Sequence, residues 1–186
     1  ISDGDSEDTI TSDGGPTVVP GGGVAVVLDT NYSGDYSLPA DAITVTVTNA
    51  TLGNGLSTND PISLVEENGY VVIDEWTIPF NPGDGYSVER VDSLTGNVFS
   101  NWVVSPCPSG SSPAEVNCSA GEIEPNDASV LVITEVMANP LSESTGEYVE
   151  LWNSGAVDVE LAGLVVEDEN LSSGATSSDT LVAFGG

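Results

Sequence analysis

The sequence predicts an all-β fold, a sandwich of two sheets, for three reasons. β-Branched and aromatic residues cluster in runs of about four to eight residues, bounded by Gly, Pro, Asn and Asp. Residues 42–48 alternate strictly between apolar and polar side chains, as a strand with one buried face does. Glycine (21 residues) and proline (11 residues) interrupt the chain too often for long helices. Many short strands with frequent turns are typical of a β-sandwich.

Each such run predicts one strand. The run at 24–28 is apolar throughout, so its strand is expected in a position covered on both faces. No segment has the spacing of apolar residues that a helix requires. In chain order, the expected strands cover residues 17–19, 24–28, 43–48, 62–66, 70–78, 86–91, 102–104, 131–137, 148–152, 157–166 and 180–184.

The charge of the chain is extreme and excludes several partners. Thirty Asp and Glu residues face one basic residue, Arg90, which gives a formal net charge of −29. A surface of this kind cannot neutralise phosphates, so we expect no nucleic-acid binding and no membrane insertion. Hydrophobic residues make up 39% of the chain. That content is too high for a disordered acidic tail, so we expect a folded core beneath an acidic surface.

Cys107 and Cys118, the two cysteines, stand in a loop-like stretch rich in Ser and Pro. Two thiols in a chain without His make a poor zinc site, so a disulfide is the better interpretation. A disulfide indicates an oxidising compartment, and we expect an extracellular or cell-surface location. The chain begins with Ile1 rather than Met, from which we expect a processed or excised piece of a longer one.

A polar stretch at 119–128 divides the chain into two blocks. It carries Pro125 and follows directly on the predicted disulfide, so we interpret it as a linker. The first block covers residues 1–118 and the second block covers residues 129–186. With only about four expected strands, the second block would struggle to bury a core of its own.

Several segments form a pattern across the two blocks. In the second block they are 131–140 (LVITEVMANP), 146–155 (GEYVELWNSG) and 161–164 (LAGL). In the first block they are 18–22 (VVPGG), 61–65 (PISLV), 69–74 (GYVVID), 85–92 (GYSVERVD) and Trp102. The second block resembles the opening half of a lamin tail domain, and the first block resembles its closing half. The resemblance implies an immunoglobulin-like β-sandwich, a fold that this family carries in nuclear lamins and in secreted and surface proteins of bacteria.

The two halves stand in inverted order, and the chain ends carry a matching pattern. Residues 8–15 (DTITSDGG) and 179–186 (DTLVAFGG) agree at four of eight positions. Both would mark the same place in the family pattern. The second block is expected either to fold onto 16–118 of its own chain, as a circular permutant, or to complete a neighbouring copy. A tandem array within a longer polypeptide is a third arrangement.

We therefore expect a structural subunit of an extracellular filament, stalk or surface array. It would assemble head-to-tail with identical subunits or tandem copies by strand complementation, because strand addition between identical copies propagates. The alternative is a calcium-dependent adhesive or targeting module of a secreted or surface protein. Its candidate calcium ligands are the closely spaced carboxylates Asp3, Asp5, Glu7 and Asp8, for which a solvated acidic turn is the competing interpretation. No other cofactor is expected.

Two further expectations concern individual side chains. Without His or Lys the usual general bases and Schiff-base chemistry are absent, so we predict that the chain is not an enzyme. A lone guanidinium among carboxylates should be ion-paired. The family resemblance places Arg90 near the strand of Glu147 and Glu150, and we predict a structural salt bridge to one of these. The three tryptophans are expected in the core.

Overall fold

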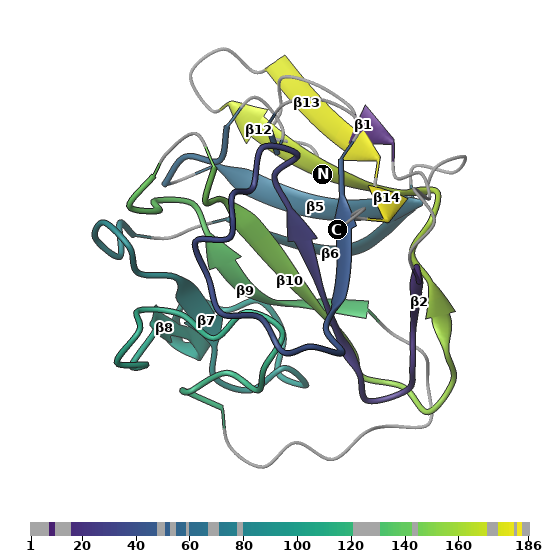
Figure 1. Ribbon diagram of the computed structural model, residues 1–186, viewed down its shortest axis with the longest axis horizontal. Coiled ribbons are helices and arrows are strands. Elements are labelled where there is room, and N and C mark those ends of the chain that lie inside the picture. The colour runs from purple at the N-terminus through teal and green to yellow at the C-terminus, as the bar shows by residue number, and fades with distance from the viewer. Residues whose placement is uncertain are drawn as a thin grey trace.

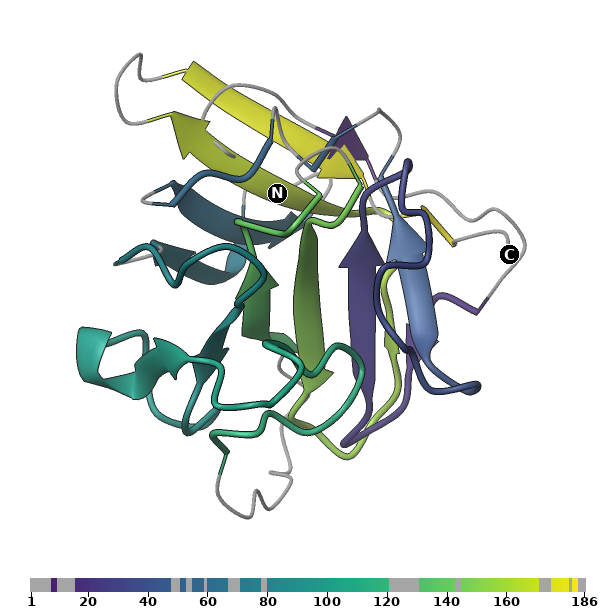
Figure 2. The same cartoon turned by 60° about the vertical axis from the view of Figure 1, so that its left-hand side comes forward.

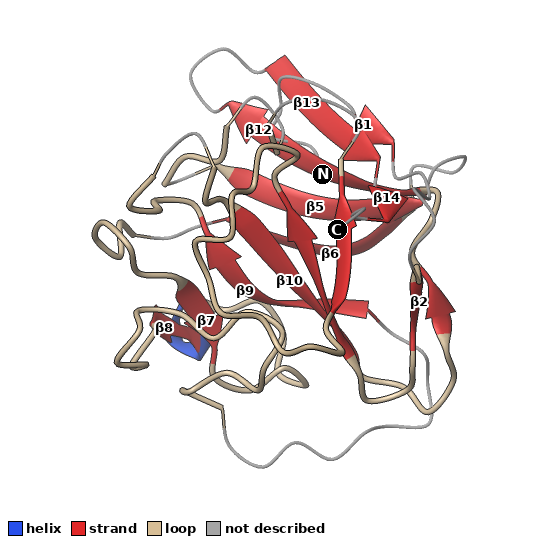
Figure 3. Ribbon diagram, in the orientation of Figure 1, coloured by secondary structure: helices blue, strands red, loops and turns tan. Residues whose placement is uncertain are grey.

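The computed structural model describes residues 8–9, 16–47, 51–52, 55–58, 60–66, 71–77, 80–120, 131–142, 145–170, 175–180 and 182–183. Nearly all regular structure in these residues is β-strand, and their one helix is a 3-10 turn, η1, at Phe99–Asn101 (Figure 3). The all-β prediction is confirmed at this level. Among the described residues, no helix has the length and apolar composition needed to cross a membrane.

The larger sheet contains strands from both ends of the sequence (Figure 1). Strands β3 and β4 run parallel, and the other neighbours in this sheet are antiparallel. In order across the sheet, the strands are β14 (Val182–Ala183), β4 (Ile43–Thr46), β3 (Val24–Leu28), β10 (Tyr148–Asn153), β9 (Leu131–Met137), β7 (Val88–Arg90) and β8 (Trp102–Val104).

A second sheet faces the first, and a two-stranded ribbon lies beside them. The second sheet runs β1 (Asp8–Thr9), β12 (Leu164–Asn170), β5 (Pro61–Glu66), β6 (Val72–Thr77), with β13 (Ala175–Thr180) also paired to β12. The ribbon joins β2 (Val18–Val19) to β11 (Val159–Glu160). The expected strand at 157–166 is thus divided into β11 and β12, because Gly163 adopts a left-handed conformation (φ 88°) between them.

The two larger sheets enclose one apolar core. Side chains alternate between the two faces along the strands of the larger sheet, except at a bulge in β9 between Ile133 and Glu135. Val27, Ile133 and Val149 are fully buried on the inner face. Ile62 and Leu64 of β5 meet them from the other sheet. Burying each such side chain stabilises the fold by about 1.5–3 kcal/mol.

The outer face of the larger sheet is covered by two loops of the first block, 29–42 and 105–119 (Figure 2). Beneath them lies a second, smaller apolar cluster made by Val26, Leu28, Met137 and Tyr148. Strand β3 is therefore buried on both faces, which confirms the expectation for residues 24–28.

The strands of the two blocks alternate within the sheets. In the larger sheet, β10 and β9 of the second block lie between β3 and β7 of the first block. In the second sheet, β12 of the second block pairs with both β1 and β5 of the first. In this chain, then, the second block pairs with its own first block. Of the stretch 119–128, only residues 119–120 fall within the described part of the chain.

Candidate functional site: the interface between the two blocks

We call the contact of residues 131–183 with residues 8–120 the block interface. Its backbone part includes two ladders on either side of the β9–β10 pair. Strand β10 pairs with β3 over five residues, from Tyr148 opposite Leu28 to Trp152 opposite Val24. On the other side, β9 pairs with β7. Without β9 and β10, strands β3 and β7 would lose these partners and expose unpaired backbone groups.

Three glutamates lie buried where the block interface crosses the outer face of the larger sheet. Glu89 of β7, Glu135 of β9 and Glu150 of β10 are 0%, 0% and 1% exposed. The registers place Glu135 directly opposite Glu89 on one side and Glu150 on the other. The first block therefore contributes one carboxyl group and the second block contributes two.

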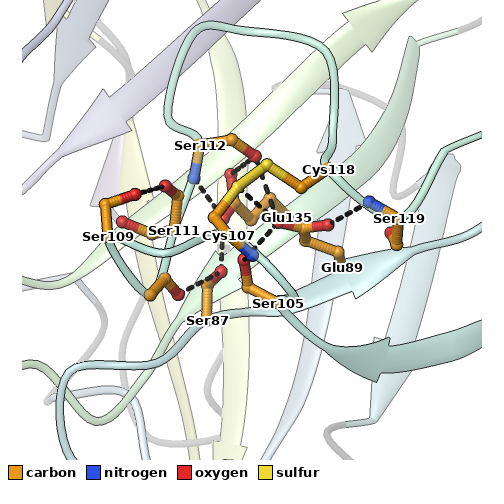
Figure 4. The surroundings of a disulfide bond; sticks show 11 residues. Ser87, Glu89, Ser105, Cys107, Ser109, Ser111, Ser112, Cys118, Ser119 and Glu135 are labelled. Carbon is orange, nitrogen blue, oxygen red and sulfur yellow. Dashed lines mark hydrogen bonds between the residues drawn. A yellow bond between two sulfur atoms is a disulfide. The ribbon is translucent and has the colours of Figure 1, made fainter.

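The loop 105–119 covers these carboxyl groups and supplies most of their hydrogen bonds. Figure 4 shows the contacts of Glu89 and Glu135. Glu89 accepts hydrogen bonds at Oε1 from the hydroxyls of Ser105 (2.5 Å) and Ser112 (3.1 Å). At Oε2 it accepts one from the backbone N–H of Ser119 (2.9 Å). Ser105 and Ser112 belong to the first block, as Glu89 does, and Ser119 directly follows it.

Glu135 is held by donors from across the block interface. Its Oε1 accepts hydrogen bonds from the Ser87 hydroxyl and from the backbone N–H of Ser112 (3.0 Å). Its Oε2 lies 3.4 Å from the Ser112 hydroxyl oxygen, which also contacts Glu89. Ser112 thus connects a carboxyl group of each block.

Glu150 is bonded at each carboxyl oxygen. Oε1 lies 2.6 Å from the Thr134 hydroxyl of the neighbouring strand, and Oε2 accepts a hydrogen bond from the backbone N–H of Ala114 (2.8 Å). Ala114 has a φ of 62°, a left-handed conformation that costs a residue with a Cβ about 1–2 kcal/mol. The hydrogen bond to Glu150 is part of what holds the loop in this conformation.

The disulfide between Cys107 and Cys118 is present, as predicted from the sequence. Its Cα atoms are 5.5 Å apart, an ordinary separation. It joins the two ends of the segment that carries Ser112 and Ala114. Closing a loop of this length stabilises the folded chain by about 2–3 kcal/mol on chain-entropy grounds.

Burial changes the acidity of this cluster. Desolvation raises the pKa of Glu135 to about 7, and the negative charge of Glu89 adds to the effect. Desolvation also raises the pKa of Glu150 well above its usual value, and the charges of Glu135 and Glu89 act in the same direction. A buried carboxylate without a cation favours the protonated form, because its charge has lost its hydration.

Arg90 forms its ion pair elsewhere, which corrects the prediction of a salt bridge to Glu147 or Glu150. Its Nη1 lies 3.0 Å from Oδ2 of Asp74 on β6. Side chains alternate along β7, so Arg90 points to the inner face while Glu89 points to the outer face with Glu150. Oδ2 of Asp74 also accepts a hydrogen bond from the backbone N–H of Ile133, so this pair too bridges the blocks.

The tryptophans lie where the sequence predicted them. Trp76, Trp102 and Trp152 are 6%, 2% and 7% exposed. Trp76 and Trp102 stack with ring centroids 3.7 Å apart, and Arg90 lies 5.7 Å from the Trp102 centroid. This contact packs the two sheets together and leaves no open aromatic surface at these two rings.

The candidate calcium ligands lie almost entirely outside the described residues, so the calcium site stays a prediction. Asp3, Asp5 and Glu7 lie outside the described residues, and of Asp8 only its place in β1 is described. In the described part of the chain, one group of three potential metal ligands comes together, Glu89 with Cys107 and Cys118. The disulfide removes both sulfur atoms from that group.

A cleft of about 450 Å³ lies beside the covering loop. Tyr36, Ser112, Leu141 and the carboxylates Asp35 and Glu115 are among the residues that line it. Because Ser112 also bonds the buried glutamates, the cleft adjoins the block interface. Its lining contains no basic group.

No protein-family model, no curated protein and no solved structure matches the chain. The lamin-tail resemblance therefore stays a prediction, and the function must be argued from the block interface itself.

The sequence did not reveal the buried glutamates. A signal was present, because Glu135 and Glu150 are the only charged residues in two largely apolar runs, LVITEVM and YVELW. A single carboxylate inside such a run can lie on a solvent-exposed face or on a covered one. The covering loop decides between these outcomes, and its position depends on contacts far apart in the sequence.

Proposed function

We propose that this chain is a structural subunit that assembles with copies of itself by exchanging the second block across the block interface. The observation that carries the proposal is the alternation of strands from the two blocks in both sheets. If the second block of one copy left its place, β3 and β7 would be open to the same strands of another copy. Such an exchange is heterologous, so it would propagate into a filament or array.

The register of the chain ends supports the same proposal. Asp8 and Thr9 pair with Val166 and Val165 of β12. Asp179 and Thr180, which begin the second copy of the Asp-Thr pattern, pair with the same two residues in the same antiparallel register. The Asp-Thr pair that begins each matching segment thus has the same two partners on β12, whereas Val182 and Ala183 of the second segment pair with β4. We take the shared register of the two Asp-Thr pairs as support for a head-to-tail array in which one copy follows another.

The disulfide and the charge of the chain support further parts of the proposal. The disulfide favours an extracellular or cell-surface setting. The large negative charge would keep single copies apart until specific strand pairing overcame the repulsion. We also infer that the sandwich is immunoglobulin-like, with the lamin-tail order of strands permuted in the chain.

Two single-cysteine copies would test the exchange. Val27 on β3 and Val149 on β10 are fully buried partners in the ladder of the block interface. A Val27→Cys copy and a Val149→Cys copy are mixed and oxidised, and the products are separated without reductant. A disulfide between the two different copies forms only if the second block of one lies beside β3 of the other.

The matched control mixes Val45→Cys with Val149→Cys, because β3 separates their strands. We expect linked copies in the first mixture, monomers in the control, and regular fibres of the unmodified chain by electron microscopy. Monomers in both mixtures, with no fibres across a range of pH and salt, would overturn the proposed function.

A further inference from the structure

Several hydroxyl groups around the buried glutamates each lie within hydrogen-bonding distance of two acceptor oxygens. The Ser112 hydroxyl lies between Oε1 of Glu89 and Oε2 of Glu135. A hydroxyl has one proton and can donate it to only one acceptor. The second contact is therefore a hydrogen bond only if one of the two carboxyl groups carries a proton and donates it to Ser112.

The remaining contacts indicate that Glu135 carries this proton. Glu89 also accepts from the Ser105 hydroxyl and the Ser119 N–H, so both of its oxygens face donors. A protonated Glu135 can donate to Ser112, which then donates to Glu89. It can equally donate to Ser87, whose hydroxyl has the carbonyl oxygen of Gly110 as a second acceptor. By either route, the acid proton of Glu135 has a hydroxyl oxygen as its hydrogen-bond acceptor.

Glu150 has a similar arrangement. The Thr134 hydroxyl faces both Oε1 of Glu150 and the backbone carbonyl oxygen of the same residue. A protonated Glu150 can donate to Thr134, and Thr134 can donate in turn to the carbonyl. An ionised Glu150 would be a fully buried charge with two donors and two other glutamates nearby.

We propose that the block interface is a pH-dependent switch, closed when Glu135 and Glu150 are neutral acids beside Glu89, and opened when those two protons are lost. The geometry carries this inference: three buried carboxyl groups from both blocks, with hydroxyls that need protonated partners. That the opened interface then exchanges with another copy rests on the proposed function. The switch within one chain does not depend on it.

The charged and titratable groups around the cluster leave its negative charge uncompensated. Tyr148 of β10 faces it from within the sheet, and burial keeps the pKa of Tyr148 well above its usual value. Tyr36 of the loop 29–42 contacts Tyr148 edge-on, and Asp35 and Glu147 lie near Tyr36. Each of these groups is neutral or negative at neutral pH. The chain's one basic residue, Arg90, points to the opposite face.

The direction of the pH dependence follows from the raised pKa of Glu135. The ordinary value is 4.5 and the value in the folded chain is about 7. Between these values the folded chain holds a proton that the unfolded chain has released. The stabilisation is fully present below 4.5 and is lost as the pH rises through about 7. Glu150 acts in the same direction.

Glutamine variants of the full-length chain would test the switch. Glutamine resembles a protonated glutamate, since its NH₂ group can donate where the acid proton did. We expect Glu135→Gln and Glu150→Gln to fold and each to reduce the pH dependence of the unfolding free energy, by up to about one proton for Glu135. Glu115→Gln, an exposed change in the same loop, is the control for net charge and should leave this dependence almost unchanged.

Glu89→Gln should behave in the opposite way. Its amide cannot serve all three donors, so at least one of Ser105, Ser112 and Ser119 loses its acceptor, and stability falls at every pH. The inference is overturned if Glu89→Gln is as well tolerated as Glu135→Gln, or if Glu135→Gln and Glu115→Gln have the same pH dependence.

A measurement on the unmodified chain tests the switch even if the variants fail to fold. Carbon NMR of the glutamate carboxyl groups should show two groups that titrate well above the others, and titration of every glutamate in the ordinary acidic range would refute the switch. The two proposals can fail separately. A chain with the expected titration and no cross-copy disulfide retains the switch and loses the proposed assembly.

Discussion

The two faces of the larger sheet are built from the same strands but are stabilised in different ways. The inner face is a continuous apolar core that includes Val27, Val149 and Leu151. The outer face carries Glu89, Glu135 and Glu150 beneath a disulfide-closed loop. Alternation along β7 and β10, and along β9 on each side of its bulge, assigns neighbouring residues to the two environments. A single pair of strands, β9 and β10, therefore joins an apolar core to a polar one.

The two faces differ in what they contribute: one contributes stability, and the other makes that stability depend on pH. Apolar burial is non-directional and barely depends on pH. The outer face depends on the position of protons and on the geometry of individual hydrogen bonds, and a partly satisfied buried network is costly. We infer that the inner face supplies most of the stability of the block interface and that the outer face makes it responsive to conditions.

The largest effect is expected from a cavity in the inner core. Leu151→Ala should lower the free energy of unfolding by about 2–5 kcal/mol, because Leu151 is fully buried and its removal leaves a void. The loss should be the same at about pH 5 and about pH 8, as chemical denaturation at each pH would show. If the loss of unfolding free energy differed strongly between the two pH values, the inner face would also respond to pH, which contradicts the distinction between the two faces.

A smaller effect is expected from opening the covering loop. Replacing both Cys107 and Cys118 by Ser should cost about 2–3 kcal/mol. The freed loop should also admit water to Glu89, Glu135 and Glu150, so the pH dependence of unfolding should weaken. Unfolding curves with and without the disulfide, measured over the same pH range, check both effects. An unchanged pH dependence would mean that the loop is held by other contacts.

The smallest effect is expected at Ala114. Ala114→Gly removes the cost of the left-handed φ of 62° but also loses a methyl group that packs near Tyr148. The net change should stay within about 1 kcal/mol. Ala114→Val, whose branched side chain tolerates this φ poorly, should be clearly destabilising. Equal thermal stability of the two variants would contradict the strain assigned to this loop.

Strands were predictable from the sequence where local pattern decides the structure. The expected strands at 24–28, 102–104 and 131–137 match β3, β8 and β9 residue for residue. The disulfide was predictable because two cysteines in a chain without histidine make a poor zinc site. Such signals depend on neighbours in the sequence.

Partners across the sheets were harder to predict. Arg90 was expected beside Glu147 or Glu150, yet it pairs with Asp74 because it points to the inner face. The burial of Glu89 depends on a loop whose hydrogen bonds reach three different strands. A composition with thirty acidic residues favours exposure for each of them, so burial of particular ones was not visible.

Exchange between copies under control of pH is the central claim, and one measurement tests it directly. Val27→Cys and Val149→Cys copies are mixed and incubated at about pH 5 or about pH 8, and both samples then receive the same brief oxidation at one pH. The account predicts more disulfide between different copies after incubation at the higher pH, where Glu135 and Glu150 lose their protons. Equal amounts in the two samples, or none in either, would contradict it.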